Sequence, residues 1–232
     1  MPEPDIDALV FDVLGTLVDE PAGIRAGIRA LDPPPDGPGT ERLLELWRRH
    51  VDREQRRILD GERPYRASDT IDLEAARLVA GAAGAPAAAE ELALSARTPP
   101  PWPDAAAGLA RLAEHFPLIG LSNASRTALL EINARAGLRW HLALSAEDAR
   151  TYKPDPAVYR LAVDASGRPP ERLLMVAAHA WDLRAAQRLG LRTAYVARPV
   201  GDPPAPSDRF DLHADGLADL ADRLGGARVP PG

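Results

Sequence analysis

Short apolar runs alternate with longer amphipathic segments through much of the chain, and this alternation predicts how the chain folds. The apolar runs predict strands at residues 8–11, 118–121, 142–145, 173–177 and 193–196. Amphipathic spacing predicts helices at residues 104–115, after Ser125, at 155–165, at 183–189 and at 217–224. Strands that alternate with helices form a parallel sheet with right-handed crossovers, so the pattern predicts an α/β fold with a Rossmann-like sheet.

The segment after the first predicted strand has a different pattern. Residues 21–97 predict helices at 22–31, 40–59, 69–81 and 87–97, and no strand. The run Thr98-Pro99-Pro100-Pro101-Trp102-Pro103-Asp104 ends this block, because consecutive prolines cannot continue a helix. We therefore expect a core domain of residues 1–20 and 98–232. An all-helical cap domain of residues 21–97 interrupts it after the first strand and can act as a lid.

Composition narrows the class of protein. The 232 residues are 45% hydrophobic, which is ordinary for a globular protein, and the net charge of −6 argues against a nucleic-acid binder. The absence of cysteine excludes disulfides, thiolate metal sites and a cysteine nucleophile. Neither a membrane span nor a signal peptide is evident in the sequence. We expect a cytoplasmic protein that has no nucleic-acid or membrane partner.

Asp12 lies where the first predicted strand meets a Gly-Thr turn, in Val10-Phe11-Asp12-Val13-Leu14-Gly15-Thr16. Its carboxylate would point out of the strand's carboxyl end, where open α/β sheets bind ligands, so Asp12 is a candidate nucleophile. A second acid two positions later would suggest a divalent cation and phosphoryl chemistry, but Leu14 offers no oxygen ligand. The alternative for Asp12 is a turn-forming or helix-capping acid, and for Thr16 a helix cap.

Other polar residues follow the later predicted strands. Ser122 and Asn123 follow the strand at 118–121, Lys153 precedes a helix, and Asp182 comes soon after the strand at 173–177. The carboxyl ends of parallel strands meet at one edge of a sheet, so these residues would share a site with Asp12. The ordinary alternatives are a turn at Ser122 and Asn123, a solvated lysine, and an acid that caps a helix from Leu183.

The order acid, serine, lysine, acid on successive strands resembles the haloacid dehalogenase superfamily. Within it, the chain is most similar to the 2-haloacid dehalogenases of type II, which act on L-2-haloacids. The segments that carry this resemblance are Leu121-Ser122-Asn123, Tyr152-Lys153-Pro154-Asp155 with Val158-Tyr159, Ala180-Trp181-Asp182 and, in the helical insert, Leu46-Trp47-Arg48. Leu14, in place of a second acid, also agrees with the dehalogenases.

The resemblance implies a two-step hydrolysis. Asp12 would attack the carbon that bears the halogen and expel halide, and water would then hydrolyse the aspartyl ester to a 2-hydroxy acid. Lys153 and Thr16 would hold and orient Asp12, while Asp182 and His179 would position or polarise the water. The resemblance implies no metal and no other cofactor.

The resemblance also implies a substrate site for a short 2-haloacid. Arg48 would stabilise the departing halide, Ser122 and Asn123 would bind the substrate carboxylate, and Leu14, Tyr159 and Trp181 would complete the site. Arg48 could instead be an ordinary exposed arginine like its neighbour Arg49, and Tyr159 could be core packing. Related enzymes are often dimers, so a homodimer is a further option.

Two positions depart from the pattern of these dehalogenases. They usually have an aromatic residue where this chain has Leu14, and a Ser-x-Asn pattern where it has Ala177 and His179. His179 is either a buried histidine bonded to the backbone or a replacement for the amide that positions the hydrolytic water, and we favour the second interpretation. The alternatives for function are a magnesium-dependent phosphatase of the same superfamily and a catalytically idle binding protein on this fold.

Overall fold

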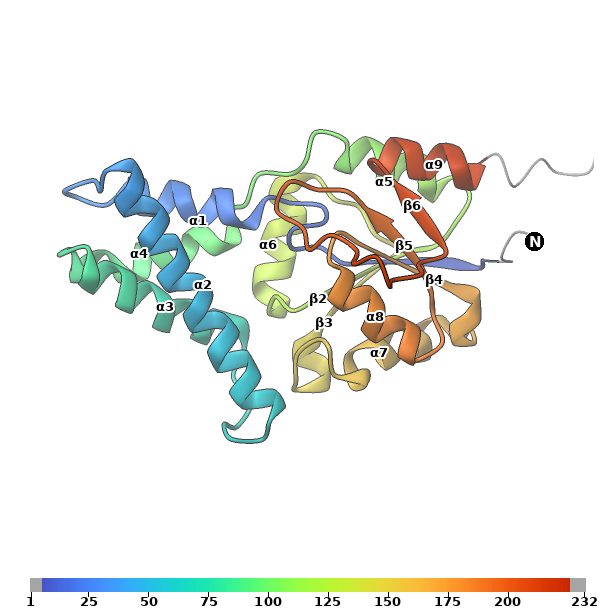
Figure 1. Cartoon of the computed structure of the whole chain (residues 1–232), viewed down its shortest axis with the longest axis horizontal. Coiled ribbons are helices and arrows are strands. Elements are labelled where there is room, and N and C mark those ends of the chain that lie inside the picture. The colour runs from blue at the N-terminus through green and yellow to red at the C-terminus, as the bar shows by residue number, and fades with distance from the viewer. Residues whose placement is uncertain (1–5, 226–232) are drawn as a thin grey trace, which may run out of the picture.

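The computed structural model describes residues 6–225 and contains a six-stranded parallel sheet in the order β3-β2-β1-β4-β5-β6 (Figure 1). The strands are β1 Ala8–Phe11, β2 Leu118–Ser122, β3 Leu142–Ser145, β4 Leu173–Ala177, β5 Arg192–Val196 and β6 Leu212–Ala214. The five predicted strands are confirmed. The edge strand β6 was not predicted, because it has only three residues and includes the exposed His213.

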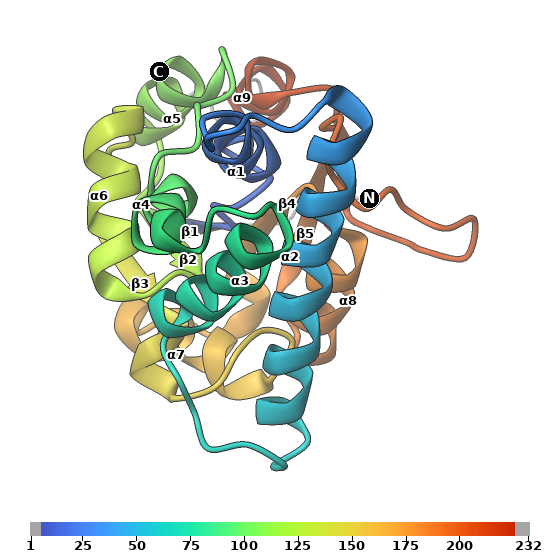
Figure 2. The same ribbon diagram turned by 90° about the vertical axis from the view of Figure 1, so that its left-hand side faces the viewer.

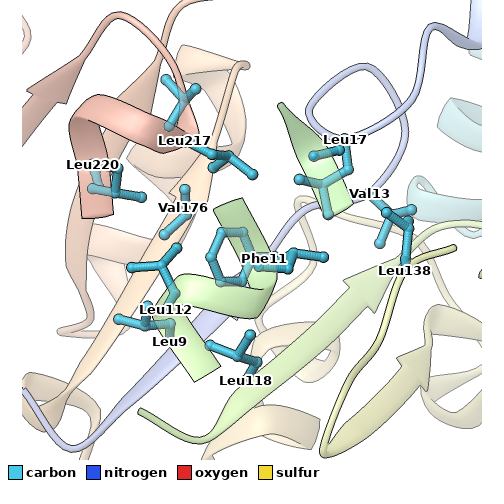
Figure 3. Close-up of a cluster of buried hydrophobic side chains, with 14 of the residues drawn as sticks. Leu9, Phe11, Val13, Leu17, Leu112, Leu118, Leu138, Val176, Leu217 and Leu220 are labelled. Carbon is cyan, nitrogen blue, oxygen red and sulfur yellow. The ribbon is translucent and has the colours of Figure 1, made fainter. Parts of the chain in front are cut away.

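Helices cover both faces of the sheet (Figure 1). One layer contains α5 (Ala105–Ala113), α6 (Arg126–Ala136) and α9 (Leu217–Gly225), and the other contains α7 (Pro156–Ser166) and α8 (Ala180–Arg188). Leu9 and Phe11 of β1 pack into the first layer, as Figure 3 shows, while Val10 packs into the second. Each such burial stabilises the fold by about 1.5–3 kcal/mol, so the end of β1 is firmly fixed.

The helical insert forms a unit beside the sheet, on the left of Figure 1 and in front of the core in Figure 2. It contains α1 (Glu20–Arg29), α2 (Gly37–Leu59), α3 (Ser68–Ala82) and α4 (Ala89–Leu94), which share a hydrophobic cluster that includes Ile28, Trp47 and Val79. Because the insert has its own core, we propose the domain division expected from the sequence, with residues 21–97 as the cap and residues 1–20 and 98–232 as the core.

Several helix boundaries differ from the predicted ones. The predicted helix at 87–97 is the short α4 between two 3-10 turns. The helices α1 and α2 begin earlier than expected, because Asp19 and Asp36 accept hydrogen bonds from the backbone of Ala22 and Gly39 and so cap their first turns. None of the helices between residues 6 and 225 has both the length and the apolar character that a membrane span requires.

The two connections between core and cap run side by side. Val18 and Pro101 form an antiparallel bridge, and the amides of Asp19 and Trp102 donate hydrogen bonds of 2.8 and 3.0 Å to Pro100 and Leu17. The expected proline-rich return is thus paired with the outgoing chain. This pairing sets the place where α1 leaves the core.

A second set of contacts joins α3 to the core. The hydroxyl of Ser68 accepts a hydrogen bond from the amide of Ser125, and the Ser125 hydroxyl donates to Asp69 at 2.7 Å. Arg97 forms ion pairs with Asp69 and, on α6, with Glu131. The cap is therefore held over the carboxyl end of the sheet from two sides.

Candidate active site

Asp12 directly follows β1 at the centre of the sheet. Its amide donates to the carbonyl of Val176 on β4, which fixes the backbone, and the residue is only 6% exposed. The hydroxyl of Thr16 donates a 2.7 Å hydrogen bond to Asp12 Oδ2 and accepts one from the amide of Ala178. Thr16 therefore holds the carboxylate and does not cap a helix.

Lys153 joins two buried carboxylates. Its Nζ lies 2.9 Å from Asp12 Oδ1 and 2.8 Å from Asp182 Oδ2. The other oxygen of Asp182 accepts a hydrogen bond of 2.5 Å from the hydroxyl of Tyr159. The backbone amide of Lys153 donates to Asn123 Oδ1 at 2.9 Å, so Asn123 anchors the loop that carries the lysine. Lys153 is also the only lysine in the chain.

Attraction between the opposite charges of this cluster offsets the free-energy cost of burying them. Burial alone would raise the pKa of the Asp12 carboxyl, but the Lys153 ammonium, with His179 and Thr16, holds that pKa well below its usual range. Burial disfavours a charged lysine, yet Asp12 and Asp182 raise the pKa of Lys153 above its ordinary value. Asp12 is therefore an anion and Lys153 a cation at neutral pH.

His179 lies against the other side of Asp12. Its Nδ1 is 3.2 Å from Asp12 Oδ2, and its ring packs so closely on Gly15 that a Cβ there would clash with His179 Cε1. Gly15 also has a φ of +79°, so glycine is required twice over. Burial opposes the charged ring, but the Asp12 carboxylate raises the pKa of His179 above its usual value.

A cavity of about 300 Å³ opens beside these residues, between α2 of the cap and the edge of the sheet. Asp12, Lys153 and His179 form part of its wall, together with the predicted site residues Leu14, Arg48, Asn123 and Trp181. Arg48 forms no ion pair with any residue of the described chain, whereas Arg49 lies outside the cavity wall and pairs with Glu45 at 3.9 Å. Arg48 is therefore the arginine available to an anion in the cavity.

Four predicted site residues lie behind the cavity wall. Thr16, Ser122, Tyr159 and Asp182 are fully buried and do not line the cavity. The Ser122 hydroxyl accepts a hydrogen bond from the amide of Ala124, as in a local turn. Its predicted contact with a substrate carboxylate stays a prediction.

The predicted start of this helix at Leu183, and with it the alternative that Asp182 is its cap, is wrong. The helix α8 begins at Ala180, which places Asp182 inside its first turn. Asp202 performs the capping from a distant loop, because its backbone carbonyl and its carboxylate accept hydrogen bonds from the amides of Ala180 and Trp181. Asp182 is thereby free to bind Lys153 and Tyr159.

Sequence reasoning missed Glu20 and Asp202. Glu20, the first residue of α1, lines the cavity, and burial raises the pKa of its carboxyl although the nearby His179 and Arg48 lower it. Asp202 reaches the cavity because the loop after β5 folds back along Ala178 and His179. The sequence signal for Glu20 is its position after Asp19, at the point where the chain leaves the core for the cap.

The donor set around Asp12 does not resemble a metal site. Leu14 stands where a second acid would be needed, and both oxygens of Asp182 are occupied by Lys153 and Tyr159. Within residues 6–225, no group of three or more His, Cys, Asp or Glu side chains is arranged to hold a metal ion.

Comparison with known proteins places the chain in a family. The family model of haloacid dehalogenase-like hydrolases matches residues 6–190, so the chain belongs to this hydrolase family. The (S)-2-haloacid dehalogenase H-109 of Pseudomonas putida is 29% identical over 201 residues, which cover 83% of this chain and 86% of that protein.

Solved structures agree with this relationship. The L-2-haloacid dehalogenase PA0810 is 33% identical, with a TM-score of 0.85 over 95% of this chain and 99% of that one. The L-2-haloacid dehalogenase of Xanthobacter autotrophicus, solved with chloropropionic acid covalently bound, is 26% identical, with a TM-score of 0.81 over 95% and 99% of the two chains. The predicted superfamily and fold are thus confirmed.

Proposed function

We propose that this protein is a hydrolytic dehalogenase that converts short 2-haloacids into 2-hydroxy acids and halide. The observation that carries the proposal is Asp12, an ionised carboxylate at a cavity wall, held by Lys153, Thr16 and His179 beside a position where Leu14 offers no metal ligand. The names of the relatives support the same substrate class.

The first step is a displacement at carbon. An Asp12 oxygen attacks the carbon that bears the halogen, the carbon–halogen bond breaks, and the pair forms an aspartyl ester and a halide ion. Arg48, which lacks an ion-pair partner among the described residues, stabilises the developing anion from the cap side. Lys153 and Thr16 fix the orientation of Asp12, so the reactants meet in one geometry.

The second step is hydrolysis of the ester. Water adds to the carboxyl carbon of Asp12, the hydroxy acid leaves, and the carboxylate is restored. The resemblance to the dehalogenases assigns this water to both His179 and Asp182, but Asp182 is buried behind the cavity wall while His179 lines the cavity. We therefore assign contact with the water to His179, and assign to Asp182 the positioning of Lys153.

The remaining expectations stay predictions. The substrate is the small-molecule partner that we propose, with no metal or other cofactor, and a homodimer is left to solution measurements. A cytoplasmic location agrees with the sequence and belongs to the same proposal. A magnesium-dependent phosphatase is disfavoured by Leu14 and by the occupied oxygens of Asp182.

Halide release from both enantiomers of 2-chloropropionate and of longer 2-chloroacids, measured with chelator present, tests the proposal. We expect release from one enantiomer, no loss on adding EDTA, and loss of turnover in Asp12→Asn. Asp164→Asn, which changes an exposed acid outside the site, is the matched control and should keep full activity. Chelator-sensitive release of phosphate from phosphate esters, without halide release, would favour the phosphatase instead.

A further inference from the structure

The contact between His179 and Asp12 has a consequence for the order of proton transfers. Nδ1 of His179 lies 3.2 Å from Asp12 Oδ2, which also accepts the Thr16 hydroxyl. Since a carboxylate only accepts, His179 Nδ1 carries a hydrogen in this contact. A base that must remove a proton from water needs a ring nitrogen without hydrogen, so a doubly protonated His179 cannot act in the second step.

The charged and titratable groups around His179 come from several elements. Asp12 follows β1, Lys153 precedes α7, Asp182 lies in the first turn of α8, and Glu20 begins α1. Two further charged residues line the same cavity, Arg48 on α2 and Asp202 on the loop that pairs with His179. Asp12 is the group in direct contact, and its carboxylate is the main cause that keeps the ring protonated; Asp182 acts in the same direction, while burial and Lys153 oppose it. The protonation of His179 therefore depends chiefly on the charge of Asp12.

The first step of the proposed reaction removes that charge. An alkylated Asp12 is a neutral ester, so its attraction for a cationic ring is lost, while burial and the Lys153 ammonium remain. We propose that alkylation of Asp12 converts His179 from a proton donor into the base of the second step. This inference rests on the proposed function, and it adds a built-in order of events that the two-step scheme alone does not contain.

The protons and charges of this sequence balance. In the first step, the carboxylate and the haloacid give the ester and halide, and His179 then releases one proton to water in the open cavity. In the second step, water gives one proton to neutral His179, and its oxygen bonds to the carboxyl carbon of Asp12. The bond from that carbon to the substrate oxygen breaks, and this oxygen takes the second proton of the water, so that the carboxylate, the hydroxy acid and protonated His179 result. The sum over both steps is haloacid plus water giving hydroxy acid, halide and one proton.

The prediction is tested by an NMR titration of the histidine rings in the wild type and in Asp12→Asn, with His179→Asn used to assign the signal among the five histidines. Asparagine has the shape of aspartate without its charge and so imitates the ester. We expect the pKa of His179 to lie above the usual value in the wild type and to fall by at least about one unit, a tenfold loss of proton affinity, in Asp12→Asn. Asp164→Asn should leave it unchanged.

An unchanged or higher pKa of His179 in Asp12→Asn would overturn the inference. If that variant does not fold, Asp12→Ala provides the same loss of charge. A second measurement uses the intact enzyme and follows ester hydrolysis in single turnovers by mass spectrometry at several pH values. The pH profile of this rate should show the lower pKa of His179 found in the variant. A profile with the higher wild-type pKa would contradict the switch. Absence of any ester from 2-haloacids would instead refute the proposed function and leave the titration unaffected.

Discussion

The charge clusters of the core and of the cap each join one cation to two carboxylates, but they differ in whether a carboxylate reaches a cavity. In the core, Lys153 is shared by Asp12 and Asp182, and Asp12 still faces a cavity. In the cap, Arg63 binds Glu54 at 2.7 Å and Glu74 at 2.6 Å, and neither acid lines the cavity beside Asp12. Pairing offsets the cost of burial in both places, and access to a cavity distinguishes the proposed nucleophile from a structural carboxylate.

The largest effect should come from removing the shared cation of the core. Lys153→Met leaves two buried carboxylates without a partner, so we expect a loss of about 3–5 kcal/mol in unfolding free energy and no measurable turnover. Lys153→Arg keeps the charge but cannot place a single compact ammonium between both acids, and it should also be inactive while losing less stability. Denaturant titration and halide release measure the two effects. A stable and active Lys153→Met would contradict the role of the lysine.

Arg48 and Arg49 provide a matched pair across the cavity wall. Arg48→Gln should lower kcat/KM by about 10²–10³-fold, because the departing halide loses a preorganised cation. Arg49→Gln changes an exposed arginine that lies outside the cavity and should leave kcat/KM unchanged. Steady-state kinetics on one 2-chloroacid compares them. Equal effects of the two substitutions on kcat/KM would contradict a role of Arg48 in stabilising the departing halide.

The cap network should influence stability alone. Burial opposes ionisation of Glu54, but hydrogen bonds from Arg53 and Arg63 lower the pKa of its carboxyl to about 2. A lowered pKa in the folded state means that the stabilisation is present above the ordinary pKa of 4.5 and is lost as the pH falls towards 2. Glu54→Gln should therefore cost about 1–3 kcal/mol at pH 7, less at low pH, with kcat unchanged. The exposed Glu62→Gln is the control, and thermal unfolding at several pH values is the measurement.

The clustering of Asp12 with Lys153 could be predicted from the sequence because these residues lie at the ends of strands or in the loops that follow them. Asp12 and Lys153 could be predicted from strand ends and from the family motifs, and the order of strands then brings them together. Composition holds a further signal: the chain has 27 arginines and a single lysine, which indicates that Lys153 stands where an arginine would not serve. The fold and the position of the proposed nucleophile were thus within reach of sequence reasoning.

What could not be predicted depends on contacts between distant segments. The start of α8 at Ala180 is set by hydrogen bonds to Asp202, and no local pattern near Ala180 records them. Glu20 faces His179 because the cap leaves the core at that point, and the strand β6 forms by pairing with β5 despite its weak pattern. Local sequence fixes neither a packing partner nor the wall of a cavity.

The central claim is that Asp12 forms a bond to the carbon of the substrate, and a single turnover in ¹⁸O-labelled water tests it most directly. With enzyme in excess over the 2-chloroacid, we expect the hydroxyl oxygen of the product to be unlabelled and the peptide that contains Asp12 to gain one ¹⁸O atom. A hydroxyl oxygen that comes wholly from the solvent, with no label in Asp12, would contradict the account.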